Sequence, residues 1–430
     1  MKIYKNPAQE DWEALSQRPS FKSEDLGKKV QGIINEVKKN GDQALRDFSL
    51  KFDGVNLEDL KVNPSEIETA KNEVSSELKE AISIASDNIR KFHSSQKSSE
   101  AKVETMPGVL CWRENVAIEN VGLYIPGGTA PLFSTILMLG IPAKLAGCGR
   151  IILCTPSDKN GKINSAILYT ASSLGITEIY KIGGAQAIAA MAFGTESIKK
   201  VNKIFGPGNQ YVMKAKELVQ QSGVAIDLPA GPSEVLVIAD SNADPEFVAS
   251  DLLSQAEHGA DSQVVLLTND KSLPQKVSEA IERQLQDLPR AEFIKKSLGN
   301  SFLVVFNSIA DCIDFSNVYA PEHLILAIDY PESYTTQILN AGSVFLGNYS
   351  CESAGDYASG TNHTLPTSGY AKSYSGVSLD SFVKKITFQK ITKKGLQNIG
   401  KTIEVMAKAE ELFAHKNAVS IRLKKIINEK

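Results

Sequence analysis

Residues 178–191 read Glu178-Ile-Tyr-Lys-Ile182-Gly-Gly-Ala-Gln186-Ala-Ile-Ala-Ala-Met191. A short apolar run enters a paired-glycine turn and continues as a helix, which is one strand–turn–helix unit. The same order recurs around Arg150–Cys154 and around Val201–Phe205. Strands that alternate with helices in this way predict βαβ units and a parallel sheet.

A second block of the same kind follows further along the chain. Its expected strands are Glu234–Ala239, Gln263–Leu267, Ser301–Phe306 and Gly342–Gly347. Residues 1 to about 100 and the end of the chain from about 396 read as helical. The stretch 350–376 is rich in Gly, Ser, Thr and Tyr without periodicity, and so long an irregular segment is more often functional than idle. We therefore expect an α/β protein with helical segments at both ends.

Bulk properties narrow the class of protein. A chain of 430 residues is too long for one ordinary core, so more than one domain is expected. A net charge of −3 gives no sign of a nucleic-acid partner, and no apolar stretch is long enough to span a membrane. The five cysteines include no CxxC, and the chain opens without an apolar leader. These features predict a cytoplasmic protein without disulfides.

Four of the five histidines stand beside residues that bind metals or move protons. The pairs are Gln255 with His258, Glu322 with His323, Asp356 with His363, and Glu411 with His415. Imidazole is a common metal ligand and the usual acid or base near neutral pH. The fifth, His93, lies in a polar stretch and is expected to be solvated.

Each pair by itself also has a plain structural interpretation as a helix end, a surface loop, a turn or an exposed ion pair. Helical spacing joins Glu411 to His415 and turns Glu410 away. The dinucleotide fingerprint GxGxxG is absent, since neither Gly183-Gly184 nor Gly206-Pro-Gly208 completes it. The residues alone therefore predict a metal-dependent α/β enzyme and leave a nucleotide cofactor open.

A set of strings resembles the histidinol dehydrogenase family, in order, over roughly residues 20 to 422. The strings are Val121-Gly-Leu-Tyr124-Ile-Pro-Gly-Gly128, Gly183-Gly-Ala-Gln186, Phe205-Gly-Pro-Gly-Asn209, Ala230-Gly-Pro-Ser233-Glu234, Ser254-Gln255-Ala-Glu-His258-Gly259, Ala320-Pro-Glu322-His323-Leu324, Ser353-Ala-Gly-Asp356-Tyr-Ala-Ser-Gly-Thr-Asn-His363 and Ala414-His415-Lys-Asn-Ala-Val419. No functional position departs from the family pattern.

The resemblance implies an enzyme that oxidises L-histidinol, through L-histidinal, to L-histidine with two NAD, the last steps of histidine biosynthesis. It implies one zinc per subunit, held by Gln255, His258, Asp356 and His415, which anchors the substrate. Glu322 and His323 would be the catalytic bases. Tyr124, Gln186 and Asn209 would bind NAD. The implied substrate contacts are Ser233, Gln255, His258, His323, Asp356, Glu410 and His415, so the family pattern selects Glu410 where helical geometry prefers Glu411.

The resemblance also implies two incomplete Rossmann-like domains and a homodimer in which the C-terminal arm completes the partner's site. The expected divisions are an N-terminal helical segment (1–19), a first domain with the substrate and metal site (20–123 and 234–377), a second with NAD (124–233) and a helical arm (378–430). Two other activities fit parts of the pattern. A zinc hydrolase could use Glu322 with a metal-bound water, and an aldehyde dehydrogenase would use a cysteine nucleophile.

Overall fold

The computed structural model describes residues 1–18, 24–127, 131–229 and 231–429. Its contacts divide the chain into two compact units, one of residues 1–95 and 118–381 and the other of residues 96–117 and 382–430. Gly128, Ala230 and the boundary expected between residues 19 and 20 lie outside the described residues. Among the described helices, none combines the length and the apolar character that crossing a membrane requires.

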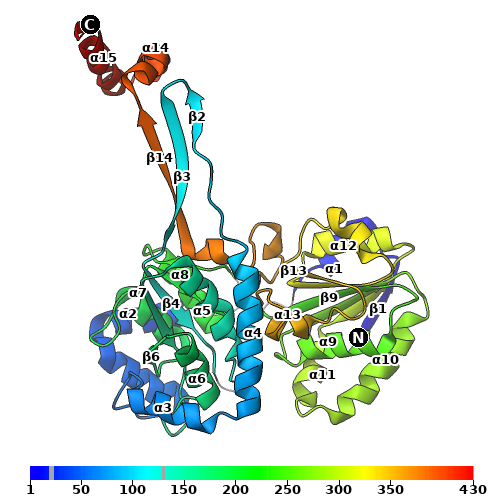
Figure 1. Cartoon of the computed structure of the whole chain (residues 1–430). Coiled ribbons are helices and arrows are strands. Elements are labelled where there is room, and N and C mark those ends of the chain that lie inside the picture. Colours follow the sequence, from blue (N-terminus) through cyan, green and yellow to red (C-terminus); the bar gives the residue numbers. More distant parts are fainter. Residues whose placement is uncertain (19–23, 128–130, 230, 430) are drawn as a thin grey trace. The chain divides into compact units, whose positions relative to one another are not determined.

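The first unit contains sheet B, which is parallel and has the strand order β6-β5-β4-β7-β8 (Figure 1). Its strands are β4 (Asn120–Tyr124), β5 (Arg150–Cys154), β6 (Glu178–Tyr180), β7 (Lys203–Phe205) and β8 (Ala225–Ile226). The connecting helices are α5 (Ser134–Ala146), α6 (Ser165–Ser173), α7 (Gly184–Phe193) and α8 (Gln210–Gln220). The strand order reverses between β4 and β7, and such a switch point is where open α/β sheets bind ligands.

Three earlier helices pack around sheet B: α2 (Glu24–Phe48), α3 (Pro64–Glu73) and α4 (Ser76–Ser94). Helix α2 contacts α7 and α8, and Val30, Ile34 and Leu45 share one core with Tyr124 and Ile152. Residues 20–123 were expected to belong with the other sheet instead. The amphipathic pattern of α2 shows that one face is buried but does not show which sheet it covers, so sequence periodicity could not have assigned it.

Sheet A, also in the first unit and also parallel, has the order β1-β11-β10-β9-β12-β13. Its strands are β1 (Lys2–Lys5), β9 (Glu234–Ala239), β10 (Gln263–Thr268), β11 (Phe302–Val305), β12 (His323–Ala327) and β13 (Ser343–Leu346). Its helices are α1 (Trp12–Leu15), α9 (Pro245–Ala256), α10 (Leu273–Gln284), α11 (Ala291–Gly299), α12 (Ile309–Tyr319) and α13 (Glu352–Tyr357). The N-terminal segment expected to be helical thus begins with a strand.

Strand β9 shows why sheet A is covered on both faces. Val235 and Val237 pack with α9, α10 and α11, while Leu236 and Ile238 pack with α1 and α12. Successive side chains of a strand point to opposite faces, so a continuous apolar run is buried twice. Figure 1 shows α9, α10 and α11 on one side of this sheet and α1 and α12 on the other. The two parallel sheets confirm the expected α/β class.

The second unit contains sheet C, in which β3 (Val109–Ala117) pairs antiparallel with β2 (Val103–Met106) and with β14 (Val383–Ile391). Helices α14 (Lys393–Ala409) and α15 (Phe413–Asn428) follow β14 and pack on each other beyond one end of the sheet (Figure 1). The arm expected to be helical from residue 378 therefore begins with a strand. Lysines on this exposed strand hide its period-2 pattern.

Candidate active site

One acidic and one basic side chain lie side by side in the sequence at the amino edge of sheet A, where β12 begins. Helix α12 ends at Tyr319 and is capped by Ala320, which has φ 54° and ψ 68° in the left-handed region. Pro321 follows, because it cannot continue the helix. The next residues, Glu322 and His323, are buried at 6% and 3% exposure. The expected strand entrance is confirmed, and the chain thus carries an ionisable pair into the interior of the first unit.

The backbone of one residue, Glu234, contacts both members of this pair. Its N–H donates to Glu322 Oε2 at 2.8 Å, and its carbonyl oxygen lies 3.2 Å from His323 Nδ1. A carbonyl can only accept, so Nδ1 carries a proton, and Nε2 is the nitrogen that is left free for a second proton or a lone pair. His323 Nε2 and Asp356 Oδ1 lie 3.5 Å apart, both buried and both without a hydrogen-bond partner among the described residues. A bound substrate or metal ion could supply the missing partner of each of these two atoms.

A cluster of possible metal ligands lies beside the pair. His258, Glu352 and Asp356 each offer one ligand atom, and these atoms all lie within 4.8 Å of one another. Helix α9 ends at Ala256, so His258 follows the helix end instead of lying on its last turn as expected. Asp356 lies on helix α13 rather than in an irregular loop. Imidazole and carboxylate donors at this spacing suit Zn²⁺.

Glu352 is a member of this cluster that the sequence analysis missed. It precedes Asp356 by four residues, so both side chains lie on one face of α13. Glu352 Oε2 also accepts a hydrogen bond of 2.7 Å from the Ser254 hydroxyl. The i, i+4 spacing was visible in the sequence, but it had no meaning while the segment was interpreted as a loop.

The Gln255 amide lies between two carboxylates. In one orientation its nitrogen donates to Glu322 Oε2 at 3.3 Å. Turned over, its nitrogen lies 2.5 Å from Glu352 Oε1 and its oxygen accepts from the Glu234 N–H at 3.0 Å. In the first orientation the amide oxygen faces the Glu352 carboxylate, and a cation held between them would remove the repulsion of these two acceptors.

Electrostatics support a cation here. Burial raises the pKa of Glu322 to about 8 and the pKa of Glu352 to about 7. Burial would lower the pKa of His323, but Glu322, Asp356 and Glu352 overcome it and raise that pKa to about 10. Burial likewise opposes ionisation of Asp356, yet the nearby imidazoles of His323, His363 and His258 lower its pKa to about 2. Three carboxylates are crowded into this site, and a bound divalent cation would favour their ionised forms.

His363 contacts the backbone of Asp356 through one ring nitrogen. Its Nδ1 lies 2.9 Å from the Asp356 carbonyl oxygen, and its Nε2 lies 3.1 Å from the Thr135 hydroxyl. Both ring nitrogens therefore contact protein atoms. His93, expected to be solvated, is instead fully buried, and its Nε2 lies 3.4 Å from the Asn362 amide. The neighbouring Lys91 and Ser95 are exposed, so the polar sequence around His93 does not reveal that its own side chain points inward.

The three residues expected to bind a nucleotide meet at the carboxyl edge of sheet B. Tyr124 ends β4, Gln186 lies in the first turn of α7 after β6, and Asn209 caps α8 after β7. The Tyr124 hydroxyl accepts a hydrogen bond of 3.0 Å from the Gly184 N–H. Gly183 gives α7 no side-chain cap, so the first N–H groups of this helix can face an anion.

A buried ion pair holds the glycine turn after β7. Lys216 and Asp227 are paired at 1% exposure each, Lys216 Nζ donates to the Gly206 carbonyl at 2.9 Å, and the Gly206 N–H donates to Asp227 Oδ2 at 2.7 Å. Gly206 has φ 126°, and a Cβ there would collide with the Tyr124 carbonyl oxygen. Only glycine fits this contact between β4 and β7.

Substitution of this lysine should be costly. In Lys216→Met we expect the apparent free energy of unfolding to fall by about 3–5 kcal/mol, because Asp227 keeps a buried charge without its partner. The control is Lys214→Met on the same helix, whose ion pair with Glu217 lies at the surface and should change stability by less than about 1 kcal/mol. Urea unfolding measures both. Equal effects of the two substitutions would contradict the structural role of the Lys216–Asp227 pair.

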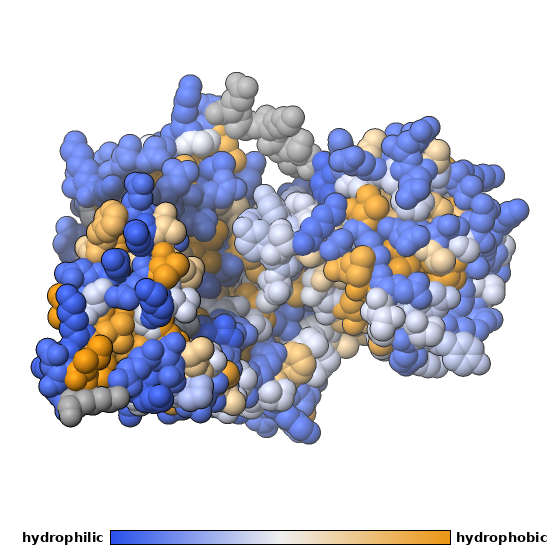
Figure 2. Space-filling view, turned by 90° about the horizontal axis from the view of Figure 1, so that it is seen from above, coloured by the Kyte–Doolittle hydropathy of each residue, from blue (hydrophilic) through white to orange (hydrophobic). Residues whose placement is uncertain are grey.

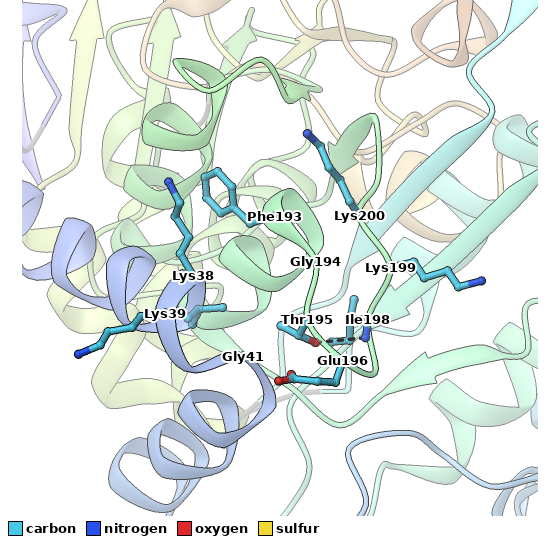
Figure 3. A pocket seen from close by; sticks show the side chains of 11 residues that line it. Lys38, Lys39, Gly41, Phe193, Gly194, Thr195, Glu196, Ile198, Lys199 and Lys200 are labelled. Atoms are coloured by element: carbon cyan, nitrogen blue, oxygen red, sulfur yellow. Dashed lines mark hydrogen bonds between the residues drawn. The ribbon is translucent and has the colours of Figure 1, made fainter.

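A separate open pocket of about 460 Å³ lies at the far end of α7 (Figure 3). Helix α7 begins beside the Tyr124 hydroxyl and ends at Phe193 in the wall of this pocket. Lys38, Lys39, Lys199 and Lys200 line it, but Figure 3 shows these side chains pointing in different directions. The pocket is therefore separate from the expected nucleotide edge and contains none of the expected site residues.

The three remaining expected site residues, Ser233, Glu410 and His415, lie in different units of the chain. Ser233 directly precedes β9, next to Glu234, and its carbonyl accepts from the Gln263 N–H at 3.1 Å. Glu410 and His415 belong to the second unit. Helix α14 ends at Ala409, Glu411 has φ 58°, and α15 begins at Phe413. His415 thus starts a new helix, so the expected i, i+4 pairing of Glu411 with His415 was wrong.

Comparison with known proteins agrees with these features. The family model described as histidinol dehydrogenase matches residues 16–423. The chain belongs to the histidinol dehydrogenase family. It is 57% identical over 423 residues to the histidinol dehydrogenase of Bacteroides thetaiotaomicron, covering 98% of this chain and 99% of that one. It is 52% identical over 412 residues to that of Escherichia coli, covering 95% and 94%.

A solved structure gives the same result for the fold. The crystal structure of histidinol dehydrogenase from Elizabethkingia anophelis is 62% identical and superposes with a TM-score of 0.97, covering 99% of this chain and 98% of that chain. Family membership makes this chain an oxidoreductase of histidine biosynthesis.

The cysteines of this histidinol dehydrogenase family member argue against a thiol nucleophile. All five are free. Burial raises the pKa of Cys148 to about 11 and the pKa of Cys154 and of Cys312 to about 12, which opposes thiolate formation. Cys111 lies in sheet C of the second unit, and Cys351 precedes α13. The buried carboxylate–imidazole pair is the better candidate for the chemistry.

Proposed function

We propose that this chain catalyses two successive NAD-dependent oxidations, from L-histidinol through L-histidinal to L-histidine. The observation that carries the proposal is the buried pair of Glu322 and His323, held by the backbone of Glu234 beside unpartnered atoms of His323 and Asp356. An alcohol that loses hydride must also lose a proton, and an aldehyde must gain water before it can lose a second hydride. One site with two bases meets both requirements.

The two bases have separate tasks. Against the effect of burial, the carboxylates around His323 raise its pKa, and a divalent cation bound beside them would oppose that rise and favour the neutral ring. In the neutral ring Nδ1 keeps the proton that faces the Glu234 carbonyl, so Nε2 is the nitrogen that would take the proton of the substrate hydroxyl as hydride leaves for NAD. Glu322 takes a proton from the water that adds to the aldehyde. Its carboxyl is buried, and burial raises its pKa to about 8, near the range in which a general base works best at neutral pH.

The donor set fits one zinc ion per subunit. Gln255, His258 and Asp356 would hold it, together with His415 of the partner subunit, and Glu352 stands close enough to act as a ligand or to orient Gln255. When bound, zinc supplies a Lewis-acidic anchor for the imidazole and amine of histidinol. Ser233 and Glu410 would add polar contacts to the substrate.

NAD would bind at the carboxyl edge of sheet B. Tyr124 and Gly206 flank the switch point between β4 and β7, and the uncapped first turn of α7 suits the pyrophosphate. Gln186 lies in that first turn, with only 2% of its surface exposed. Asn209 caps α8 through its side-chain oxygen, so it would contact the cofactor while also holding the helix.

The active form would be a homodimer in which the second unit reaches the partner's site. Helices α14 and α15 carry exposed apolar side chains, namely Val405, Met406, Phe413, Ile421 and Ile427. Figure 2 shows hydrophobic surface over these two helices. Such a surface suits contact with another chain, and the zinc ligands of the first unit leave a position for His415.

The zinc proposal is tested by removing a ligand. We expect His258→Asn to lower zinc affinity by more than the roughly 10- to 100-fold loss that follows removal of a residue supporting a metal ligand, and to abolish histidinol-dependent NADH formation. The fold should persist, because α9 packs in the core on one face of sheet A and α13 contacts α9. Metal analysis and circular dichroism measure this, with Glu257→Gln as the neighbouring control. A metal-free wild-type enzyme with full activity would contradict the ligand assignment.

A further inference from the structure

Arg18 and Glu234 form a buried ion pair behind the catalytic pair. Arg18 Nε donates to Glu234 Oε1 at 2.9 Å and Arg18 Nη2 donates to Glu234 Oε2 at 2.8 Å. The two side chains are 13% and 1% exposed, and the guanidinium carbon lies 3.5 Å from the centre of the Tyr319 ring. A two-point contact of this kind fixes the carboxylate in position as well as in charge.

The same guanidinium reaches the turn that precedes Glu322. Arg18 Nη2 also donates to the Ala320 carbonyl at 3.3 Å. Ala320 is fully buried and holds φ 54°, a backbone conformation that residues with a side chain seldom adopt. Such a conformation persists only where its surroundings enforce it, and Arg18 is one of the groups that hold this turn.

Glu234 links Arg18 to both catalytic residues through its side chain and its backbone. Its carboxylate is fixed by Arg18 and by the Ser368 N–H, which donates to Oε1 at 2.7 Å. Its backbone N–H and carbonyl then contact Glu322 and His323. Arg18 therefore acts on the catalytic pair from two directions, through Glu234 on β9 and through Ala320 at the end of α12.

We propose that Arg18 is a positioning residue for Glu322 and His323. It touches neither of them, and its effect is to keep the bases in the geometry that proton transfer requires. The proposal rests on the catalytic roles assigned above. Displacements of about 1 Å at a reacting group can cost about 100-fold in rate, so loss of Arg18 should lower kcat far more than it changes KM or zinc content.

The experiment uses full-length holoenzyme carrying Arg18→Ala or Arg18→Lys. In Arg18→Ala we expect kcat to fall by about 100-fold, with the KM for histidinol and the zinc content close to wild type. Added guanidinium ion should raise this kcat at least about tenfold, because it replaces the missing group where the substrate does not bind. Arg18→Lys keeps the charge but loses the two-point geometry, so its kcat should lie between that of the wild type and that of Arg18→Ala.

The matched control is Arg150→Ala. Arg150 also makes a two-point contact with a glutamate, through Nε at 3.0 Å and Nη2 at 2.8 Å to Glu178 Oε2, but at the amino edge of sheet B. Its kcat should stay close to wild type and should not respond to guanidinium. A general effect of losing a buried arginine, or of the added salt, would therefore appear in both variants.

The proposal is overturned if Arg18→Ala keeps wild-type kcat, or if its loss of kcat equals its loss of folded protein and guanidinium restores none. Should Arg18→Ala not fold, Arg18→Lys decides, and wild-type kcat in that variant overturns the proposal equally. A wrong assignment of the catalytic roles would show separately in Glu322→Gln, which keeps Arg18. If Glu322 is not a base, that variant should oxidise the aldehyde at the normal rate.

Discussion

In Glu322→Gln we expect oxidation of histidinal to fall by about 10²- to 10⁴-fold, while oxidation of histidinol to histidinal is affected much less. Only the second step needs a proton taken from water. Glutamine keeps the size of the side chain and can still meet the Glu234 backbone, but its amide cannot act as the base. In His323→Asn both steps should fall, since each releases hydride and proton together.

The two steps can be measured separately by single turnovers that start from histidinol or from supplied histidinal. Glu246→Gln is the matched control, because Glu246 is a carboxylate in the first turn of α9 and its ion pair with Arg283 lies at the surface. It should leave both steps unchanged. Equal loss of both steps in Glu322→Gln would contradict the division of tasks between the two bases.

Mixed dimers should recover activity that neither parent has. If His415 reaches the partner, each site combines Glu322 of one chain with His415 of the other. Glu322→Gln and His415→Ala homodimers should both be nearly inactive. A mixed dimer collects both defects in one site and leaves the other wild type. Random exchange makes about half of the dimers mixed, so about a quarter of full activity should return.

Mass spectrometry of the exchanged sample establishes that mixed dimers are present. A mixture of Glu322→Gln with Glu322→Gln carrying a different tag is the control and should stay inactive. Activity that remains at the level of the inactive parents, with mixed dimers confirmed, would show that His415 serves its own chain. This outcome would remove the exchanged arm from the proposal without affecting the other ligands.

The parallel sheets could be predicted from sequence because buried strands carry a strong local signal. Arg150–Cys154 and Glu234–Ala239 are strands with the bounds that their apolar runs suggest. Strands β1 and β14 were missed. Each lies at the edge of its sheet, is mostly exposed and contains several lysines, so neither has the apolar run of a buried strand. Edge strands protected by charge do not read as strands.

The candidate site was predictable to a different degree. The motifs located Glu322, His323 and Asp356, and the structure brings these residues together. Glu352 and Arg18 were not found, because their roles depend on contacts between segments far apart in the chain. The break after Ala409 depends on the left-handed conformation of Glu411, which no local residue preference announces. Tertiary contacts therefore decide the residues around the catalytic pair.

The central claim is that one site performs both oxidations, and the number of NADH formed per histidinol tests it most directly. The assay uses limiting histidinol, excess NAD and an aldehyde trap such as semicarbazide in solution. The account predicts two NADH for each histidinol consumed and no trapped aldehyde, because histidinal stays bound between the steps. One NADH with trapped histidinal, or histidinol consumed without NADH, would contradict it.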